Sequence, residues 1–326
     1  MKALLLQEKG KWKEMTVREI DIPRVGAGEI LVEVHAVGLN PVDYKTATGG
    51  HPKWIFPHIL GLDVAGVVVE AGEGVTSWNA GDRVVYHGDL TKQGGYAEYA
   101  VTNANTVSRI PEGVTFEEAA ALPTAGYTAY QALHSKLPLE QLGTILVHAG
   151  AGGVGGFAVQ LAKLAGKQVI STASRHNHEY VKSLGADEVI DYQTENIPSR
   201  VFSITNGRGV DAVIDTVSRQ SATDALELVS FMGHVVHIAG APDYTKIKPF
   251  TKAASIHEVA LGAAHQSGDV IAEKALAEIG DAMLSLLAEG KISSMLREVI
   301  RLDEVPGALE RLSERHVHGK IVAKVK

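Results

Sequence analysis

The stretch from residue 145 to residue 172 constrains the fold of this chain more than any other. An apolar run over Ile145–Val147 predicts a buried strand, and Gly150, Gly152 and Gly155 follow it with the spacing G-x-G-x-x-G. A segment with apolar residues at helical spacing comes next, and then a second apolar strand at residues 169–170. This order of strand, glycine turn, helix and strand is the context in which that spacing binds a dinucleotide.

Each glycine of the turn has a physical task. Gly150 allows the tight turn, Gly152 lets the backbone approach a pyrophosphate, and Gly155 lets the helix pack close to the strand. Amide N–H groups at the helix start face the phosphates, so we expect cofactor contacts from Gly150, Gly152, Gly153, Val154 and Gly155. No Lys-Ser or Lys-Thr pair follows Gly155, which disfavours an NTP-binding loop. The alternative is a glycine turn that serves only helix–strand packing.

Length and composition exclude several classes of protein. A chain of 326 residues suggests about two domains, and a net charge of −7 does not indicate a nucleic-acid partner. No apolar stretch reaches the ~18 residues of a membrane span, and Met1 precedes a short alternating strand pattern rather than a signal peptide. We therefore expect a cytoplasmic protein without nucleic-acid or membrane partners. The absence of cysteine excludes disulfides, thiolate metal ligands and a cysteine nucleophile.

Two rhythms divide the chain. The first ~120 residues alternate short apolar segments with glycine turns, which predicts a partly open β-barrel with few helices. From residue 145 strands and helices alternate, which predicts a doubly wound parallel sheet of the α/β class. We expect its strands at 145–149, 168–173, 187–191, 211–215 and 233–239, and a last strand at 257–264. A long helix is expected at 269–290, and a final strand at 320–325 that rejoins the first domain.

Several further motifs occur in a characteristic order. They are Gly38-Leu39-Asn40-Pro41-Val42-Asp43-Tyr44, Gly61-Leu62-Asp63-Val64-Ala65-Gly66, Gly81-Asp82-Arg83-Val84, Gly94-Gly95-Tyr96-Ala97-Glu98-Tyr99, Ala149 to Gly155, and Gly319-Lys320-Ile321-Val322. With these motifs the chain resembles, over essentially its full length, the zinc-free, quinone oxidoreductase-like branch of the medium-chain dehydrogenase/reductase superfamily. The resemblance implies a GroES-like catalytic domain over 1–123 and 267–326, a Rossmann cofactor domain over 124–266, and an active site in the cleft between them.

The resemblance also implies that a metal site is missing. In the zinc-dependent branch a cysteine stands near Asn40, a Gly-His-Glu motif at Gly61-Leu62-Asp63, and another cysteine near Thr124. None of those ligands is present here, and neither is the four-cysteine structural zinc lobe. Zinc requires a shell of Cys, His and carboxylate ligands, and Asp63 alone does not form one. We expect no metal.

The residues after the second strand of the cofactor domain bear on cofactor choice. An acid about 20 positions after the glycine turn would bind the ribose 2′-hydroxyl of NAD, but residues 171–176 contain no Asp or Glu. Ser174 and Arg175 can instead hold a 2′-phosphate, because the planar guanidinium matches phosphate oxygens. By resemblance Tyr192 lies against the same phosphate. These residues predict NADPH; the alternative for Arg175 is an ordinary exposed arginine.

The candidate catalytic residues open the helix at residue 41. Asn40 has the sequence context of an N-cap and Pro41 that of the first helical position, and by resemblance the cap residue also faces the cleft. Tyr44 stands four residues after Asn40, so we expect both on one helix face, toward substrate; a core-packing tyrosine is the alternative. Asp43 is better explained as a helix-start carboxylate than as a base, and Asp63 is similarly ambiguous.

Two further groups are expected near the cofactor. By resemblance Thr124 and Thr128 flank the domain junction near the nicotinamide, where a hydroxyl can bind the carboxamide; helix capping is the alternative. Ligands of doubly wound sheets bind at the carboxyl ends of the strands. We therefore expect backbone contacts to the cofactor from the residues after the fourth and fifth strands, Val217, Ile238, Ala239 and Gly240.

The chain has 14 histidines, which raises the possibility of a metal site. The pairs His176/His178, His234/His237 and His316/His318 stand in separate segments without matching Cys or carboxylate patterns. His234 and His237 lie in a predicted strand, where residues three apart point to opposite faces. We expect surface or packing roles for them.

These observations together predict a metal-free reductase that uses NADPH. The expected substrate is a small-molecule quinone or α,β-unsaturated carbonyl, to which the cofactor delivers hydride while the protein orients the reactants and excludes water. Two alternatives remain: a nucleotide-binding sensor or structural protein with little turnover, and a metal-dependent alcohol dehydrogenase. The resemblance implies a homodimer that pairs through the last Rossmann strand.

Overall fold

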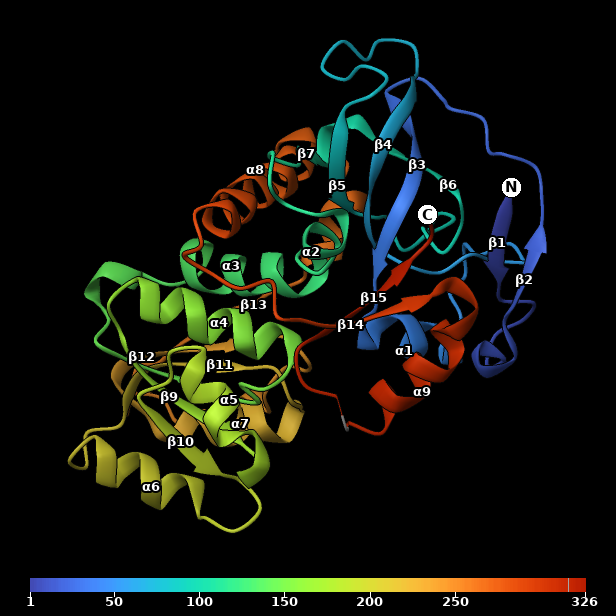
Figure 1. Cartoon of the computed structure of the whole chain (residues 1–326). Coiled ribbons are helices and arrows are strands. Elements are labelled where there is room, and N and C mark those ends of the chain that lie inside the picture. The colour runs from blue at the N-terminus through green and yellow to red at the C-terminus, as the bar shows by residue number, and fades with distance from the viewer. Residues whose placement is uncertain (316) are drawn as a thin grey trace. The chain divides into compact units, whose positions relative to one another are not determined.

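The computed structural model describes residues 1–315 and 317–326, and these form two compact units (Figure 1). The β-rich unit consists of Met1–Tyr127 and Leu261–Lys326, and the nucleotide-type unit consists of Thr128–Ala260. The chain therefore leaves the first unit and returns to it. The sequence predicts these crossings at residues 124 and 266, a few residues away from where the two units divide.

A parallel six-stranded sheet forms the centre of the nucleotide-type unit (Figure 1). Its strand order is β10-β9-β8-β11-β12-β13, so the order reverses between β8 and β11. This is the doubly wound Rossmann arrangement expected from the sequence, and ligands bind such sheets at the carboxyl ends beside the reversal. The strands are β8 (Thr144–Val147), β9 (Gln168–Ala173), β10 (Glu188–Asp191), β11 (Val210–Asp215), β12 (Val229–His237) and β13 (Ser255–Glu258).

Helices between these strands bury apolar faces against the sheet, around a core that includes Leu146, Ile170 and Val213. Helix α4 packs on β8 and β9, and α7 packs on β11 and β12. Gly166 and Gly185 follow α4 and α5 with positive φ, where a left-handed residue ends a helix. The α-helices of this unit are α3 (Thr128–Tyr130), α4 (Gly153–Leu164), α5 (His178–Ser183), α6 (Ile197–Ile204) and α7 (Arg219–Leu228).

The last strand differs from its prediction. Strand β13 ends at Glu258, and the predicted continuation to residue 264 is wrong, because Leu261–Gln266 form the 3₁₀ helix η8. Three small residues, Gly262 to Ala264, occupy this stretch. Glycine and alanine have low strand propensity, and the chain also changes from one unit to the other at residues 260 and 261.

The β-rich unit contains a seven-stranded sheet and a separate pair, β1–β2 (Figure 1). The sheet order is β14-β15-β3-β4-β5-β7, with β6 also paired to β3. As predicted, the last strand of the chain rejoins this unit, where β15 pairs with β3. The strands are β1 (Lys2–Leu5), β2 (Thr16–Glu19), β3 (Glu29–Gly38), β4 (Asp63–Ala71), β5 (Arg83–His87), β6 (Tyr99–Asn103), β7 (Val107–Arg109), β14 (Leu296–Arg301) and β15 (Lys320–Lys324).

Four α-helices belong to this unit, each with a recognisable start signal. Thr115 caps α2 by accepting from the Glu118 N–H, and Asp269 caps α8 by accepting from the Ile271 N–H. The long helix predicted at 269–290 is α8. The four are α1 (Pro41–Gly49), α2 (Phe116–Ala120), α8 (Val270–Ala288) and α9 (Val305–Ser313).

Short turns complete both units. The β-rich unit also has the π-type turn η3 (Pro123–Tyr127) and the 3₁₀ turns η1 (Trp12–Glu14), η2 (Ala104–Thr106) and η9 (Leu302–Glu304). The nucleotide-type unit has the π-type turn η4 (Gln131–Ser135) and the 3₁₀ turns η5 (Leu139–Gln141), η6 (Arg175–Asn177) and η7 (Tyr244–Lys246).

Candidate active site and cofactor edge

A buried polar cluster lies in the β-rich unit, where β3, β4 and β15 are neighbours. Asp63 opens β4 and pairs in register with Gly38, the last residue of β3. The Leu39 N–H donates to the Ile321 carbonyl, which brings Lys320 beside the β3–α1 turn. The sheet therefore collects side chains that are far apart in sequence.

Asp63 is the central acceptor of this cluster. One carboxylate oxygen, Oδ1, accepts from the Thr124 N–H at 2.9 Å and from the Thr124 hydroxyl at 2.5 Å. The other oxygen, Oδ2, accepts from Asn40 Nδ2 at 2.8 Å and lies 3.6 Å from the Lys320 ammonium. Asp63, Asn40 and Lys320 are all almost completely buried. This density of donors is what a buried carboxylate needs in order to stay ionised.

A second buried carboxylate, Asp43, lies in the first turn of α1. Its Oδ2 accepts from the Asn40 N–H at 2.8 Å and from the Tyr96 hydroxyl at 3.0 Å. Asp43 thus satisfies an orphan amide at the helix start, as the sequence suggested, while Asn40 stands at the N-cap and turns its side chain to Asp63 and Lys320.

The two carboxylates of the cluster differ in how strongly their neighbours stabilise the ionised form. Burial raises the pKa of Asp43 and the neighbouring Asp63 charge adds to this effect, while hydrogen bonds and Lys320 lower it, so that the pKa comes to about 7. Burial also raises the pKa of Asp63, but Lys320 and the donors from Thr124 and Asn40 oppose it. The pKa of Lys320 is lowered by burial. Two carboxylates share one ammonium, and the acid with fewer donors, Asp43, is the one whose pKa lies near neutrality.

The cluster does not fit the metal that the zinc-dependent branch holds at these positions. Asn40, Asp63 and Thr124 do come together, but they offer an amide, one carboxylate and a hydroxyl, and the Lys320 ammonium already lies among them. Zinc is held by thiolate, imidazole and carboxylate groups, and a fixed positive charge repels it. Over the residues that the structure describes, no group of three or more His, Cys, Asp or Glu side chains is arranged to hold a metal ion.

Asn40 and Tyr44 are placed differently from each other. Tyr44 is half-buried, and its ring lies 5.8 Å from that of Trp12, whereas the Asn40 amide contacts Asp63 and Lys320. The spacing rule for one helix face requires helical backbone at both residues. Asn40 is extended, with φ −139° and ψ 153°, and so stands outside the helix. Their catalytic roles remain predictions.

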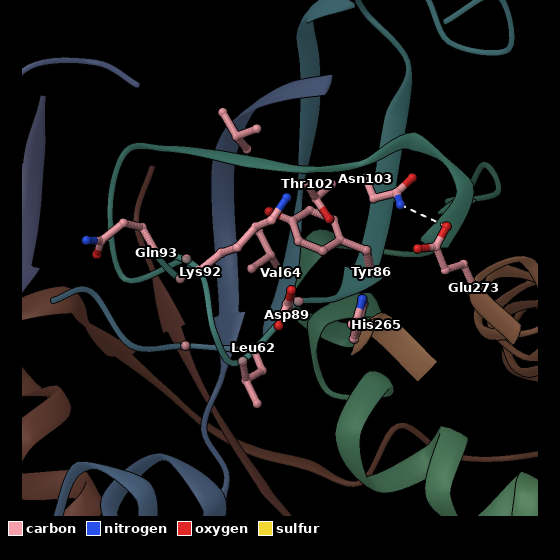
Figure 2. A pocket seen from close by; sticks show the side chains of 15 residues that line it. Leu62, Val64, Tyr86, Asp89, Lys92, Gln93, Thr102, Asn103, His265 and Glu273 are labelled. Carbon is pink, nitrogen blue, oxygen red and sulfur yellow. Dashed lines mark hydrogen bonds between the residues drawn. The ribbon is translucent and has the colours of Figure 1, made fainter. Parts of the chain in front are cut away.

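A pocket of about 110 Å³ lies on another side of β4, at the ends of β4, β5 and β6 (Figure 2). Val64 lines it, whereas the preceding residue, Asp63, belongs to the polar cluster, because successive strand residues point to opposite faces. Figure 2 shows Glu273 at its side, where it accepts from Asn103 at 2.9 Å. The buried Tyr86 hydroxyl in its wall has no hydrogen-bond partner among the described residues. Such a hydroxyl can donate to a carbonyl or a water oxygen.

The glycine turn lies in the nucleotide-type unit, after β8. A Cβ at Gly155 would lie 2.2 Å from the Ala149 carbonyl oxygen, and one at Gly150 would lie 2.2 Å from Ser171 Oγ. Gly155 therefore has no room for a side chain against the backbone, and a side chain at Gly150 would displace that of Ser171. Gly152 is the N-cap of α4, and Gly153 and Val154 begin the helix, whose first turn has no acidic side chain. Free amide groups at such an end suit an anionic pyrophosphate.

The expected 2′-phosphate residues lie on adjacent strand ends. Ala173 of β9 pairs with Asp191 of β10, so Ser174 and Arg175 leave the sheet beside Tyr192. Arg175 and Tyr192 are exposed. Asp191 directly precedes Tyr192, and its carboxylate turns back to accept from the Gln193 N–H and the Thr194 hydroxyl. That carboxylate is therefore engaged in its own turn.

The remaining predicted contacts lie at the same edge or at the start of the unit. Asp215 ends β11 and its Oδ1 accepts from the Val217 N–H, while the Ile238 N–H donates to the Asp215 carbonyl. These two bonds hold the loops that carry Val217, Ile238, Ala239 and Gly240 against the strand ends. Thr128 opens α3 and is buried.

The sequence did not single out some members of these sites. Lys320 lies inside the last of the motifs, and the feature that could have indicated its role is a charged residue at the start of an apolar strand. Tyr96 lies in a glycine-flanked motif, and nothing in that motif indicates that its hydroxyl bonds Asp43. His148 Nδ1 lies 3.2 Å from the Thr172 hydroxyl beneath the glycine turn. Of the histidine pairs, His234 contacts His257 at 3.1 Å, and His316 lies outside the described residues.

Comparison with known proteins identifies the chain's family. The model for the alcohol dehydrogenase GroES-like domain matches residues 26–112, and the model called zinc-binding dehydrogenase matches residues 153–276. The chloroplast envelope quinone oxidoreductase homolog of Arabidopsis thaliana is 35% identical over 314 residues, which is 94% of this chain and 92% of that protein.

Solved structures agree with this over the whole chain. The quinone oxidoreductase of Coxiella burnetii has a TM-score of 0.84 at 31% identity, covering 100% of this chain and 99% of that one. The Escherichia coli quinone oxidoreductase complexed with NADPH has a TM-score of 0.86 at 26% identity, with both chains covered completely. This chain therefore belongs to the quinone oxidoreductase-like medium-chain dehydrogenase/reductases, a family of NAD(P)-dependent oxidoreductases.

Proposed function

We propose that this protein is an NADPH-dependent, metal-independent reductase that transfers hydride to a quinone or an α,β-unsaturated carbonyl. The observation that carries the proposal is the pair of strand ends in the nucleotide-type unit, where Arg175 and Tyr192 are exposed beside each other. A nicotinamide cofactor supplies the hydride when it is bound.

NADPH is favoured over NADH by the charges at this edge. Arg175 offers a planar guanidinium to a phosphate, and the Ser174 hydroxyl stands next to it, within 3.3 Å of His176 Nε2. An acid that would prefer the ribose 2′-hydroxyl is lacking after β9, and the Asp191 carboxylate is occupied by its own turn. The E. coli relative was solved with NADPH, which agrees with this choice.

The protein's part in the reduction is to orient and to stabilise. Negative charge develops on the substrate oxygen as it accepts hydride, and fixed hydrogen-bond donors stabilise it. Tyr44 is the proposed side-chain donor. Asn40 is the second proposed catalytic residue, and its amide bonds Asp63 and Lys320 in the polar cluster. The metal-independent form of the proposal is supported by the Lys320 ammonium among Asn40, Asp63 and Thr124.

The proposed assembly is a homodimer that pairs through β13. This strand is at the edge of the parallel sheet, and an unpaired edge offers N–H and C=O groups to a second copy. The compartment is left as a prediction: the Arabidopsis relative is a chloroplast envelope protein by name. Within the described residues, none of the helices combines the length and the apolarity required to span a bilayer.

A screen of NADPH oxidation tests the function directly. Quinones, enones, aldehydes and alcohols are offered with NADPH and, separately, with NADH. We expect turnover with quinones or enones and a preference for NADPH. Tight NADPH binding without turnover on any of these compounds would instead support a nucleotide sensor, and alcohol oxidation with NAD would contradict the proposal.

A further inference from the structure

Lys320 is unusual because its charge is buried completely in the middle of the β-rich unit, with 3% of the residue exposed. A lysine is almost never buried in this way unless it is paired. Its ammonium carries three donors and faces three acceptors: the Leu39 carbonyl at 3.1 Å, Asn40 Oδ1 at 2.6 Å and Asp63 Oδ2 at 3.6 Å.

These contacts determine the orientation of the Asn40 amide. Its oxygen must face the ammonium of Lys320, because an ammonium has no acceptor, and its nitrogen then faces the Asp63 carboxylate at 2.8 Å. The reversed amide would oppose donor to donor and oxygen to oxygen. The side chain therefore has one orientation as long as both charges are present.

The same charges reach Thr124 through Asp63. The Thr124 hydroxyl donates to Asp63 Oδ1 at 2.5 Å, and its N–H donates to the same oxygen at 2.9 Å. Because the hydroxyl proton is used in this bond, the Thr124 oxygen can act toward another group only as a hydrogen-bond acceptor. Lys320 supports the ionised form of Asp63 and in this way also orients Thr124, which it does not touch by any bond described.

We propose that Lys320 is a positioning residue of the reduction site, whose buried ammonium fixes the orientation of the Asn40 amide and of the Thr124 hydroxyl. This inference rests on the proposed function, together with the expectation from the family resemblance that Asn40 faces the substrate and that Thr124 lies near the nicotinamide. Lys320 itself contacts neither. Its alternative is a purely structural ion pair, and this can be separated from positioning because many buried ion pairs can be replaced by neutral groups without loss of stability.

The test is the double variant Lys320→Met/Asp63→Asn. It removes the Lys320 ammonium and the Asp63 carboxylate together, so neither of these two charges stays buried without the other. The new amide at position 63 can accept from Thr124 with its oxygen, but its nitrogen faces Asn40 and turns that amide over. We expect the double variant to retain the urea midpoint and the NADPH affinity of the wild type. We expect its kcat, counted per NADPH-binding site, to fall by roughly ten- to a hundredfold with little change in KM, since small misplacements of reacting groups have effects of this size.

A matched control uses the next lysine of the same strand. Lys324 is exposed and lies 3.7 Å from Glu117, so Lys324→Met/Glu117→Gln removes a lysine–carboxylate pair whose ammonium is exposed. We expect the wild-type kcat from it. Counting kcat per NADPH-binding site removes any misfolded fraction, so a purely structural defect would not lower it.

The outcomes separate the two proposals. A folded double variant with the wild-type kcat, while the wild type is active, overturns the positioning role alone. A loss of NADPH affinity equal to the loss of kcat also overturns it, because the defect would then lie in folding or cofactor binding. A wild type that turns over none of the screened substrates overturns the proposed function, and the positioning role with it.

Discussion

The two units of this protein place their buried polar groups in opposite ways. In the nucleotide-type unit the centre of the sheet is apolar, and buried acids such as Asp191 and Asp215 stand at the carboxyl ends of strands, where they cap adjacent loops. In the β-rich unit charges lie between strands, with Asp63 and Lys320 held by neighbours in the sheet. The nucleotide-type unit therefore has its polar groups at the edge of the sheet, whereas the β-rich unit pairs opposite charges with each other in its interior.

This difference determines how each unit should respond to substitution. An exposed group at that edge, such as Arg175, is open to solvent or ligand, so its loss should weaken binding and leave the fold intact. A charge in the interior is balanced by its partner, so its loss exposes the partner to the full cost of burial without compensation. Substitutions in the interior of the β-rich unit should therefore lower stability, and those at the edge of the nucleotide-type unit should lower affinity.

Asp63→Ala should have the largest effect, a loss of stability. It leaves the Lys320 ammonium buried beside Asn40 and removes the acceptor of Thr124. Breaking a buried pair on one side costs about 3–5 kcal/mol, which urea unfolding followed by fluorescence would measure. Asp82→Ala, which removes a surface pair with Arg109, should cost no more than about 1 kcal/mol. Equal losses for the two variants would remove the contrast between interior and surface charge.

Tyr44→Phe tests whether the β-rich unit supplies the donor to the substrate. If the hydroxyl acts mainly in the transition state, kcat should fall by roughly ten- to a thousandfold with the NADPH affinity unchanged. The substitution retains the ring that packs near Trp12, so stability should change little. A silent Tyr44→Phe together with a raised KM in Tyr44→Ala would assign the ring to the shape of the pocket and the donors to the backbone and solvent.

Arg175→Ala tests the edge of the nucleotide-type unit. A hydrogen bond to a charged group contributes ~1.5–3 kcal/mol, so NADPH binding should weaken by roughly ten- to a hundredfold. NADH affinity and the urea midpoint should hardly change, because Arg175 is exposed. Titration of both cofactors by fluorescence measures this, and an equal loss for NADPH and NADH would show that Arg175 does not contact the 2′-phosphate.

Asp43→Asn should alter how stability depends on pH. The folded-state pKa of Asp43 is raised from 3.8 to about 7, in a setting that includes Asp63, Lys320 and Tyr96. Between these two values the folded protein binds a proton that the unfolded chain has released, so this group makes stability fall as pH rises from about 4 to about 7.

The substitution removes that slope and should stabilise the protein most at pH 8. Urea unfolding at pH 5, 6, 7 and 8 measures it. In Asp82→Asn the curve between pH 5 and pH 8 should run parallel to that of the wild type, because Arg109 lowers the pKa of Asp82 below its ordinary 3.8 and its contribution is lost only as pH falls below that value. Parallel pH curves for the wild type and Asp43→Asn would contradict the assignment of the proton to Asp43.

Removal of metal should have the smallest effect of all. The cluster offers no thiolate or imidazole to zinc and carries its own cation in Lys320. Dialysis against a strong chelator should leave the activity unchanged, and elemental analysis should find far less than one zinc per chain. Activity that is lost to the chelator and restored by zinc would overturn both the metal-independent proposal and our account of Lys320.

The sequence predicted the nucleotide-type unit more completely than the β-rich one. Strands β8 to β12 lie close to their predicted positions because each is an apolar run followed by a turn, which is a local signal. Neither β14 nor α9 was predicted, and the last Rossmann strand ends at Glu258 rather than at residue 264. Those elements depend on long-range pairing, as where β14 pairs with β15, and local propensity carries little information about it.

What the sequence determined by itself is the local chemistry: a glycine turn between a strand and a helix, a missing acid after β9, and a chain without cysteine. Each follows from residues within one short segment, where backbone geometry is set by near neighbours. The tertiary structure alone decided that Asn40, Asp43, Asp63, Thr124 and Lys320 share one buried cluster. Their partnership spans 280 residues between Asn40 and Lys320, and no local rule predicts which distant strand brings a counter-charge, because only the sheet order makes them neighbours.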